Sequence, residues 1–202
     1  TTDPTGAVTS YAYDEAGRLL STTDPLGGVT TYAYDEDSNL VSVTDPTGAT
    51  TTQRYDALGR RIASTDATGA DTAFTYDEDG NPTGVTDPSG GQTATAYDAR
   101  GRVVTTRDAL GGVTSRTYDD ADRLVTSTDP LGGVTTYAYD AAGRRTSITD
   151  ATGAETRTAY TEAGRIASTT DPTGALTSYA YDAAGRQRSV TDPLGGVTTY
   201  AY

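Results

Sequence analysis

The sequence of 202 residues contains no cysteine, histidine, methionine, tryptophan or lysine, and all 15 basic side chains are arginine. Without Cys and His the chain can form neither a disulfide nor a Cys/His zinc site, and no Ser-His-Asp or Cys-His nucleophile system. The 28 acidic side chains give a net charge of −13, which argues against a phosphate backbone as a partner. We therefore expect no enzyme activity, no cofactor and no nucleic-acid partner.

Large aliphatic side chains are also scarce, and together with the high net charge this composition is typical of disordered chains. No apolar run approaches the roughly 18 residues that a membrane-spanning helix needs, so we expect no membrane insertion. No signal peptide is visible and the chain does not begin with Met. We therefore expect it to be a segment of a longer protein.

Tyrosine, by contrast, occurs 15 times, and its placement is strictly periodic. One Tyr column recurs every 21 residues without insertion or deletion, and columns of Asp, Gly and Thr keep the same period. This regularity is the signature of a repeat protein and argues against disorder. We expect residues 1–202 to form a single array of about 9.6 repeats, truncated within a repeat at both ends. The columns run from Tyr13 to Tyr202, Asp3 to Asp192, Gly6 to Gly195 and Thr9 to Thr198.

Each repeat contains two turn signals that separate two strand-like runs. Residues 3–6 read Asp-Pro-Thr-Gly, where Pro suits the second turn position and Gly a positive φ. Residues 13–18 read Tyr-Asp-Glu-Ala-Gly-Arg, whose late Gly17 suits a hairpin loop that closes in the left-handed region. Residues 8–13 and 18–23 are rich in Thr, Val, Tyr and Leu, which favour strands, and no stretch shows helical spacing. The sequence predicts an all-β fold.

Alternation along each strand assigns its side chains to two faces. In the first strand we expect Tyr11 and Tyr13 on the same face. In the second strand we expect Leu20 and Thr22 to share a moderately apolar face. Position 19 varies widely between repeats, and we expect Leu19 and its counterparts on the opposite, solvated face.

Stacked repeats, rather than a thick core, are expected to stabilise this fold. Identical side chains would line up between repeats as Tyr, Thr and Val columns, with each cross-strand pair contributing roughly 0.2–1 kcal/mol. The Arg18 column should lie on Tyr rings or pair with carboxylates of the Asp14 type, since Arg suits both contacts better than Lys. We predict about twenty short strands in a curved antiparallel strip of 21-residue hairpins, a section of a shell or fibre. A parallel β-solenoid is the alternative, disfavoured because both turns look tight.

The pattern Tyr-Asp-x-x-Gly-Arg, a following Leu or Val, and Thr-Asp-Pro-x-Gly resembles the RHS/YD repeat family, and the resemblance covers the whole chain. It is seen at residues 13–19 and 139–144. The resemblance implies a strip of antiparallel hairpins that spirals into a hollow shell, as in bacterial RHS proteins and the TcB/TcC components of insecticidal toxin complexes, with a related barrel in teneurins. It further implies an extracellular or cell-surface (secreted) location. Its implied partners are further repeats or identical subunits and an enclosed C-terminal toxin domain.

Some positions depart from the repeat, and their scatter suits tolerant turns better than a site. The self-cleaving core of the family, and the variable effector domain that follows it, are not seen in this segment. Asp-Pro-Leu-Gly at Asp24, Asp129 and Asp192 resembles part of that core, but here it is the repeating turn. The departures are Ser38 and Asp122 for Gly17, Asn39 and Asn81 for Arg18, Ala67, Ala109 and Ala151 for Pro4, and Thr161 for Asp14.

We assign no catalytic, cofactor-binding or metal-binding residue. Residues 77–81, Asp-Glu-Asp-Gly-Asn, look like the start of a calcium loop, but no Glu follows at the twelfth position and turn formation explains the same residues. Exposed Tyr rows could stack on sugars, although packing within the sheet is the simpler explanation. Residues 23–35 and 128–140 are identical, whereas an active site would break the symmetry of the repeats.

The leading interpretation is a non-catalytic repeat section of a secreted or cell-surface RHS-type protein, whose wall encapsulates and delivers a toxin. The alternative is an extracellular fibre or adhesin in which the stacked repeats bind neighbouring subunits or glycans.

Overall fold

The computed structural model describes all 202 residues and contains 19 strands and no helix. Neighbouring strands in the sequence pair antiparallel within one open sheet. The predicted all-β array of tandem hairpins is thus confirmed, and the parallel solenoid is wrong. The strands are β1 Ser10–Tyr13, β2 Leu19–Thr23, β3 Val29–Tyr34, β4 Leu40–Thr44, β5 Thr50–Tyr55, β6 Arg61–Thr65, β7 Asp71–Tyr76, β8 Pro82–Thr86, β9 Gln92–Tyr97, β10 Val103–Arg107, β11 Val113–Tyr118, β12 Leu124–Thr128, β13 Val134–Tyr139, β14 Arg145–Thr149, β15 Glu155–Tyr160, β16 Ile166–Thr170, β17 Leu176–Tyr181, β18 Gln187–Thr191 and β19 Val197–Thr199.

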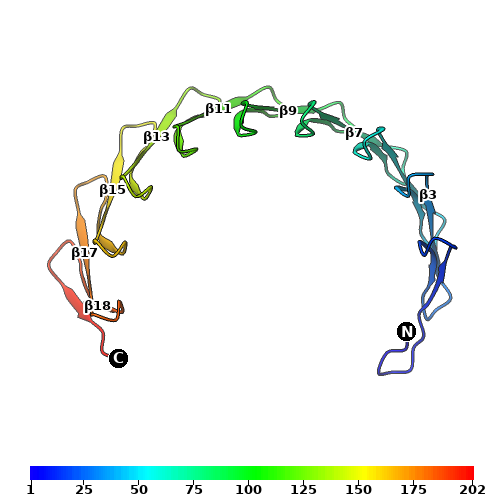
Figure 1. Cartoon of the computed structure of the whole chain (residues 1–202), viewed down its shortest axis with the longest axis horizontal. Helices are drawn as coiled ribbons and strands as arrows, with labels where there is room; N and C mark the ends of the chain where they lie inside the picture. Colours follow the sequence, from blue (N-terminus) through cyan, green and yellow to red (C-terminus); the bar gives the residue numbers. More distant parts are fainter. The chain divides into compact units, whose positions relative to one another are not determined.

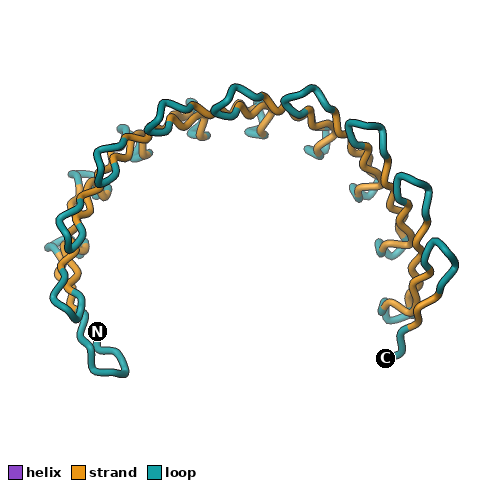
Figure 2. The backbone as a smooth tube through the Cα atoms, turned by 180° about the vertical axis from the view of Figure 1, so that it is seen from behind, coloured by secondary structure: helices purple, strands orange, loops and turns teal.

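The chain divides into two compact parts, which are described separately. The N-terminal part comprises residues 1–96 and 108–111, and the C-terminal part comprises residues 97–107 and 112–202. Within each part the chain runs back and forth between two rows of short loops, one row at each edge of the sheet (Figures 1 and 2). Each row therefore repeats its own loop chemistry many times along one side of the sheet, where the strands end.

Each loop has a residue with positive φ at its next-to-last position, as the sequence predicts. Gly6 has a φ of +88° and donates its N–H to the Asp3 carbonyl at 3.0 Å, and Gly17 has a φ of +80° and contacts Asp14 in the same way. Glycine adopts this conformation without the steric penalty of a Cβ. The only residues other than Gly with positive φ are Ser38 and Asp122, which interrupt the Gly17 column.

A β-bulge in each Tyr-Asp hairpin corrects the predicted face of position 19. Tyr11 lies opposite Thr22, but the register then shifts, so that Tyr13 lies opposite Leu19 rather than Leu20. Directly opposed residues point to the same side of a sheet, so Leu19 shares the face of Tyr11, Tyr13 and Thr22. We call this side the tyrosine face. The expectation that position 19 lies on the opposite face is therefore wrong, because the extra residue of the bulge interrupts strict alternation.

The side-chain columns expected from the repeat are present, but the expectation for the Tyr column needs one correction. Thr31 lies opposite Thr44, and Tyr32 lies opposite Val43, an aromatic and β-branched pair of the kind that stabilises sheets. Identical Tyr residues, however, do not lie side by side. A repeat is two strands wide, so equivalent residues recur on every second strand with another strand between them. Contact between successive tyrosines must therefore be mediated by other groups.

The register is staggered within each part. Ser21 lies opposite Thr31, and Thr31 lies opposite Thr44, which is two residues beyond the position equivalent to Ser21 in the next repeat. In the C-terminal part Ser147, Arg157 and Thr170 show the same offset. This is a shear of one residue per strand, the ratio found in eight-stranded barrels of shear 8, whose strands tilt by about 36°. The repeats therefore advance obliquely to the hydrogen-bond direction.

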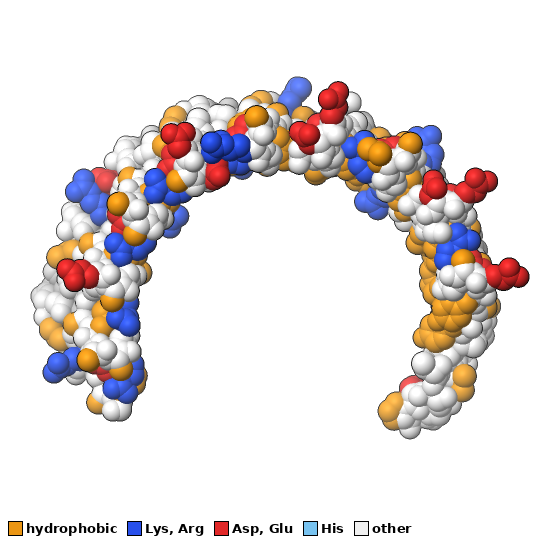
Figure 3. All heavy atoms as spheres, in the orientation of Figure 1, with side chains coloured by type: hydrophobic (Ala, Val, Ile, Leu, Met, Phe, Trp, Pro, Cys, Tyr) orange, Lys and Arg blue, Asp and Glu red, His pale blue; other side chains and the backbone are white.

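The sheet has no core. Ala63, 8% exposed, is the one buried residue of the chain. The chain exposes 12973 Å², whereas a compact monomer of this mass exposes about 9000 Å². Figure 3 shows hydrophobic side chains at the surface over the first strands of the N-terminal part. The structure contains no helix long and apolar enough to span a membrane. Stability must come from contacts within and between neighbouring repeats.

Candidate functional site

The loop between β1 and β2 is organised by one carboxylate. Asp14 Oδ1 accepts hydrogen bonds from the backbone N–H groups of Ala16 at 3.0 Å and Arg18 at 2.8 Å, and its Oδ2 accepts from Arg18 Nε at 2.7 Å. These bonds favour the ionised form, and the pKa of Asp14 is lowered, chiefly by the hydrogen bond from the Arg18 side chain. The carboxylate thus fixes the direction of the Arg18 side chain.

That side chain reaches into the next repeat. The guanidinium carbon of Arg18 lies 5.1 Å from the centre of the Tyr34 ring, and its NH1 donates to the Asp35 carbonyl at 3.2 Å. The Tyr34 hydroxyl in turn donates to the Leu19 carbonyl at 3.0 Å, back in the first repeat. We call this set of contacts, made by Asp14, Arg18 and Tyr34 or their counterparts, the inter-repeat clasp. It links the Asp-Arg pair of one repeat to the Tyr of the next.

The full clasp occurs five times with nearly constant geometry. In each case Arg Nε bonds the preceding Asp, NH1 donates to a carbonyl of the next repeat, and the guanidinium lies over the next Tyr ring at 4.7–5.1 Å. The expectation that this Arg column contacts Tyr rings or Asp carboxylates is confirmed, since each of these five arginines contacts both. The Arg–Tyr pairs are Arg18–Tyr34, Arg60–Tyr76, Arg102–Tyr118, Arg123–Tyr139 and Arg144–Tyr160.

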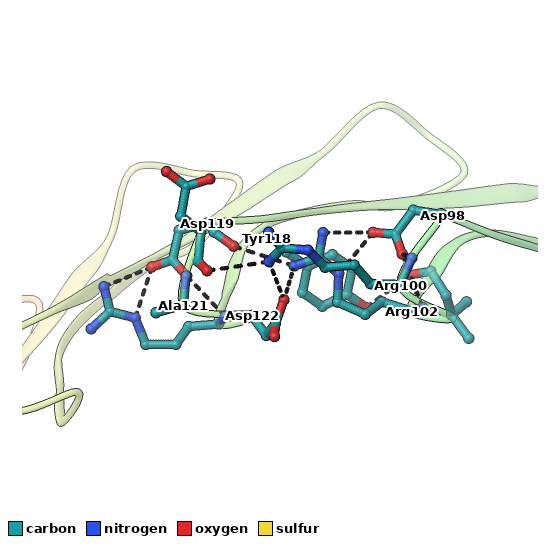
Figure 4. A network of polar contacts seen from close by, with 10 residues as sticks. Asp98, Arg100, Arg102, Tyr118, Asp119, Ala121 and Asp122 are labelled. Atoms are coloured by element: carbon teal, nitrogen blue, oxygen red, sulfur yellow. Dashed lines mark hydrogen bonds and ion pairs between the residues drawn. The ribbon is translucent and has the colours of Figure 1, made fainter.

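The clasp in the C-terminal part around Arg102 carries an additional ion pair (Figure 4). Arg102 NH1 lies 2.6 Å from Asp122 Oδ1, and NH1 of Arg100 lies 2.8 Å from the same oxygen. Arg102 also bonds Asp98, and this hydrogen bond is the main reason that the pKa of Asp98 is lowered to about 2. Two guanidinium groups of one repeat thus converge on one carboxylate of the next.

The two residues other than Gly with positive φ both contact an Arg of the preceding repeat. Asp122 has a φ of 63° where most repeats have Gly, and Ser38 has a φ of 69°. The Ser38 hydroxyl accepts a hydrogen bond from Arg18 NH1 at 3.0 Å, in parallel with the bond from Arg102 to Asp122. Both residues offset the cost of the left-handed conformation with a contact to the preceding repeat. In the sequence alone these positions look like scattered departures from the repeat, because the Arg that contacts each of them lies one repeat earlier.

Three repeats have altered clasps. Asn39 and Asn81 replace Arg, and their side chains bond the local Asp35 and Asp77 at 3.0 Å instead of reaching forward. In the third repeat Thr161 replaces Asp. Its hydroxyl accepts the backbone N–H of Arg165 at 3.1 Å, as Asp Oδ1 does elsewhere. No carboxylate pairs with Arg165, which lies 5.7 Å from the Tyr181 ring.

The second row of loops is closed by a smaller motif. Asp3 Oδ1 accepts hydrogen bonds from the N–H groups of Thr5 and Ala7 and from the Thr5 hydroxyl at 2.6 Å. The hydroxyl bond is the main reason that the pKa of Asp3 is lowered. Where the loop reads Asp-Pro-Leu-Gly, Asp24 still caps the N–H groups of Leu26 and Gly28. These aspartates therefore serve as turn caps, in agreement with the sequence interpretation.

The candidate calcium loop also forms a turn. Asp77 Oδ1 accepts the backbone N–H of Asn81 at 2.8 Å, and Oδ2 accepts its side-chain amide, so both oxygens have donors from the loop itself. No group of three or more acidic side chains is arranged to hold a metal ion anywhere in the chain. The repeating chemistry is therefore an array of structural clasps, and the tyrosine face presents their rings and guanidinium groups.

Comparison with known proteins assigns this array to a family. The RHS Repeat family model matches residues 1–29, 13–50, 34–71, 55–92, 76–113, 118–156, 160–197 and 181–202. The chain therefore belongs to the RHS repeat family, and it is a structural repeat section. A search of curated proteins found no match.

Solved structures share the fold at low identity. A crystal structure of TcdB2-TccC3-TEV is 20% identical with a TM-score of 0.65, and the alignment covers 91% of this chain and 11% of that one. The Tc holotoxin pore of Photorhabdus luminescens is 16% identical with a TM-score of 0.57, covering 95% and 15% respectively. TcdB2-TccC3-Cdc42 is 18% identical, with a TM-score of 0.58 and coverages of 91% and 13%. The chain thus corresponds to less than a sixth of each of these molecules.

Proposed function

We propose that the chain is a non-catalytic section of the wall of a secreted or cell-surface RHS-type shell, which encloses and delivers a toxin. The observation that carries this proposal is a sheet without a core whose repeats are joined by forward-reaching clasps. Such a sheet leaves its tyrosine face uncovered, so it is suited to forming one side of a larger enclosure. The stagger of one residue per strand supports it, because a sheared sheet coils as it grows. The likeness to Tc toxin structures supplies a precedent for the fold.

In this proposal residues 1–202 act as one array of about 9.6 repeats that continues into further repeats. Its partners are those repeats, or identical subunits, and an enclosed C-terminal toxin domain. The proposed wall neither binds nucleic acid nor inserts into a membrane. In five repeats the cationic group of the wall is an Arg fork that contacts a carboxylate and a Tyr ring at once, a pair of contacts that suits Arg better than Lys.

The test is electron microscopy and limited proteolysis of the full-length protein that contains this segment. The proposal predicts a hollow particle in which a C-terminal domain resists protease until the particle is opened by mild denaturant. A filament, or a C-terminal domain that is digested as fast as the isolated domain, would contradict it. As a control, the same domain expressed alone should be digested at once.

A second candidate function is an extracellular fibre or adhesin. It is favoured by the constancy of the clasp, which is rebuilt in both parts from the same residue types and does not depend on position in the array. Repeats of this kind can propagate in one direction without closing. In that case the microscopy would show filaments whose length increases with the number of repeats, and the tyrosine face would bind neighbouring subunits or glycans.

A further inference from the structure

Arg165 differs from the other arginines of its column. In five repeats the equivalent guanidinium hydrogen-bonds both a carboxylate and a carbonyl of the next repeat. The Arg165 side chain makes no hydrogen bond or ion pair, and its one recorded partner is the Tyr181 ring. Arg165 is nonetheless half-buried. A cation that has lost part of its hydration without gaining an anion is in an unfavourable state.

No neighbouring carboxylate supplies the counter-ion that Arg165 lacks. Asp182, the carboxylate of the next clasp, is bonded to Arg186 Nε at 2.8 Å. Glu162, in the same loop as Arg165, is exposed. On the far side the guanidinium lies so close to Gly185 that a Cβ there would collide with it, which limits its freedom to move away. The guanidinium thus lies against Gly185 of the next repeat without a counter-ion.

In the other repeats that have this Arg, an Asp supplies its counter-ion. Here Thr161 takes its place, and a Thr hydroxyl can help to bind an anion. Thr161 Oγ1 keeps the role of Asp Oδ1 by accepting the Arg165 N–H at 3.1 Å. The second oxygen, which in Asp140 accepts Arg144 Nε at 2.7 Å, has no equivalent at Thr161. The Thr hydroxyl retains a proton that it can donate. This loop therefore carries an O–H donor and a guanidinium fork that has no carboxylate partner.

We propose that Thr161 and Arg165 form a binding site for a small oxyanion, and that carboxylate is the class that fits best. A carboxylate would restore the oxygen that bonds Nε in the other clasps, and its planar shape matches the guanidinium fork. The same group is carried by a free carboxylic acid and by an Asp or Glu side chain of a neighbouring polypeptide. This inference goes beyond the structural role of the array and does not depend on it.

The experiment uses the full chain labelled with ¹⁵N at arginine, which gives 15 side-chain Nε–H groups to follow by NMR. Sodium formate is titrated against sodium chloride at matched ionic strength, and Arg165→Lys identifies the Arg165 signal. We expect a saturating shift of Arg165 Nε–H with formate alone. A shift no larger than that of the exposed Arg54 would overturn the proposal.

Two reciprocal variants provide the controls. Thr161→Asp supplies the missing oxygen within the chain, so the Arg165 signal should lie with those of the complete clasps and no longer respond to formate. Asp140→Thr removes the oxygen from a complete clasp and should make Arg144 respond. Thr161→Asp introduces the residue found in the other repeats, so it tests the proposal even if Asp140→Thr does not fold. A formate response at Arg165 that survives Thr161→Asp would contradict the assignment.

A short Asp-containing peptide distinguishes the two sources of carboxylate. A peptide that saturates the Arg165 shift at a lower concentration than formate indicates a polypeptide side chain as ligand, whereas an equal or weaker response indicates a free carboxylate. In either case the binding must be lost in Thr161→Asp, and peptide binding that persists there would contradict this site.

Discussion

The Tyr34 hydroxyl donates a 3.0 Å hydrogen bond to the carbonyl of Leu19, fifteen residues earlier in the chain. The ring that carries this hydroxyl lies under the guanidinium of Arg18, so one tyrosine contacts the preceding repeat through both its edge and its face. In a sheet with a single buried residue, this relationship replaces the core as the link between repeats. The hydroxyl bond to Leu19 and the ring contact with Arg18 can be removed separately.

Tyr34→Phe removes the hydroxyl and keeps the ring. We expect a loss of about 0.5–1.5 kcal/mol in the free energy of unfolding, the usual net value of one hydrogen bond. The measurement is urea denaturation followed by tyrosine fluorescence or circular dichroism. Tyr11→Phe is the matched control, because the Tyr11 hydroxyl makes no hydrogen bond in the structure. Equal losses in the two variants would show that the bond to Leu19 is not stabilising.

Gly17→Ala tests the left-handed loop position. The added Cβ meets no neighbouring atom within 4 Å, so the expected loss of about 1–2 kcal/mol is the conformational penalty alone. Ala16→Gly, one residue earlier in the same loop, is the control and should cost less. If chemical denaturation gives no loss for Gly17→Ala, the φ of +80° is not required by the loop.

Asp122→Asn keeps the shape of a side chain that two guanidinium groups contact and removes its charge. We expect lower stability at low salt, because Arg100 and Arg102 lose their common anion. The difference from wild type should shrink in 1 M salt, where the Debye length falls to about 3 Å. Thermal unfolding at the two salt concentrations measures this. A difference that is independent of salt would mean that hydrogen-bond geometry, not charge, accounts for the effect.

Acid should weaken the clasps in a defined direction. The pKa of Asp98 is lowered to about 2, chiefly by Arg102, so between its ordinary value and about 2 the unfolded state binds more protons than the folded state. The stabilisation is complete at neutral pH and is lost as pH falls through this range. Asp98→Asn should therefore be less stable than wild type at pH 7 and differ less from it at pH 2. Parallel curves for the two proteins between pH 7 and pH 2 would contradict this assignment.

Asn39→Arg should complete a clasp that the chain lacks. Asp35 already bonds the Asn39 side chain, and the Tyr55 ring stands one repeat ahead in the place that Tyr34 has for Arg18. We expect a gain of about 0.5–1 kcal/mol from the guanidinium over the ring. Asn39→Lys is the control and should gain less, since an ammonium lacks the planar fork. Equal gains measured by urea denaturation would show that only charge matters.

The sequence predicted most of the fold because its turn chemistry is explicit. Gly6 and Gly17 mark positive φ, Asp3 and Asp14 mark the caps, and no run has helical spacing, so tandem hairpins follow. The β-bulge was not predicted, because Leu19 and Leu20 are both apolar and alternation alone cannot show which of them faces Tyr13. This single extra residue moved position 19 to the other face.

The candidate site was predicted only in part, for a geometric reason. The composition of the clasp was expected, since Arg18 was placed with Tyr rings or Asp carboxylates. Its direction was not, because nothing in one repeat indicates that Arg18 contacts the local Asp14 and the distant Tyr34 at once. Ser38, Asp122 and Thr161 looked like tolerated departures for the same reason. The Arg partners of Ser38 and Asp122 lie in the equivalent loop of the preceding repeat, the carboxylate partner of Arg165 is missing, and only the register shows this.

A double-mutant cycle between Arg123 and Tyr139 tests the central claim most directly. These residues belong to successive repeats, and the guanidinium lies 4.7 Å from the ring centre. The free energy of unfolding is measured for wild type, Arg123→Met, Tyr139→Leu and the double variant. The account predicts a coupling energy of at least about 0.5 kcal/mol. Additive losses, with a coupling energy of zero within error, would contradict the claim that clasps between repeats hold the sheet together.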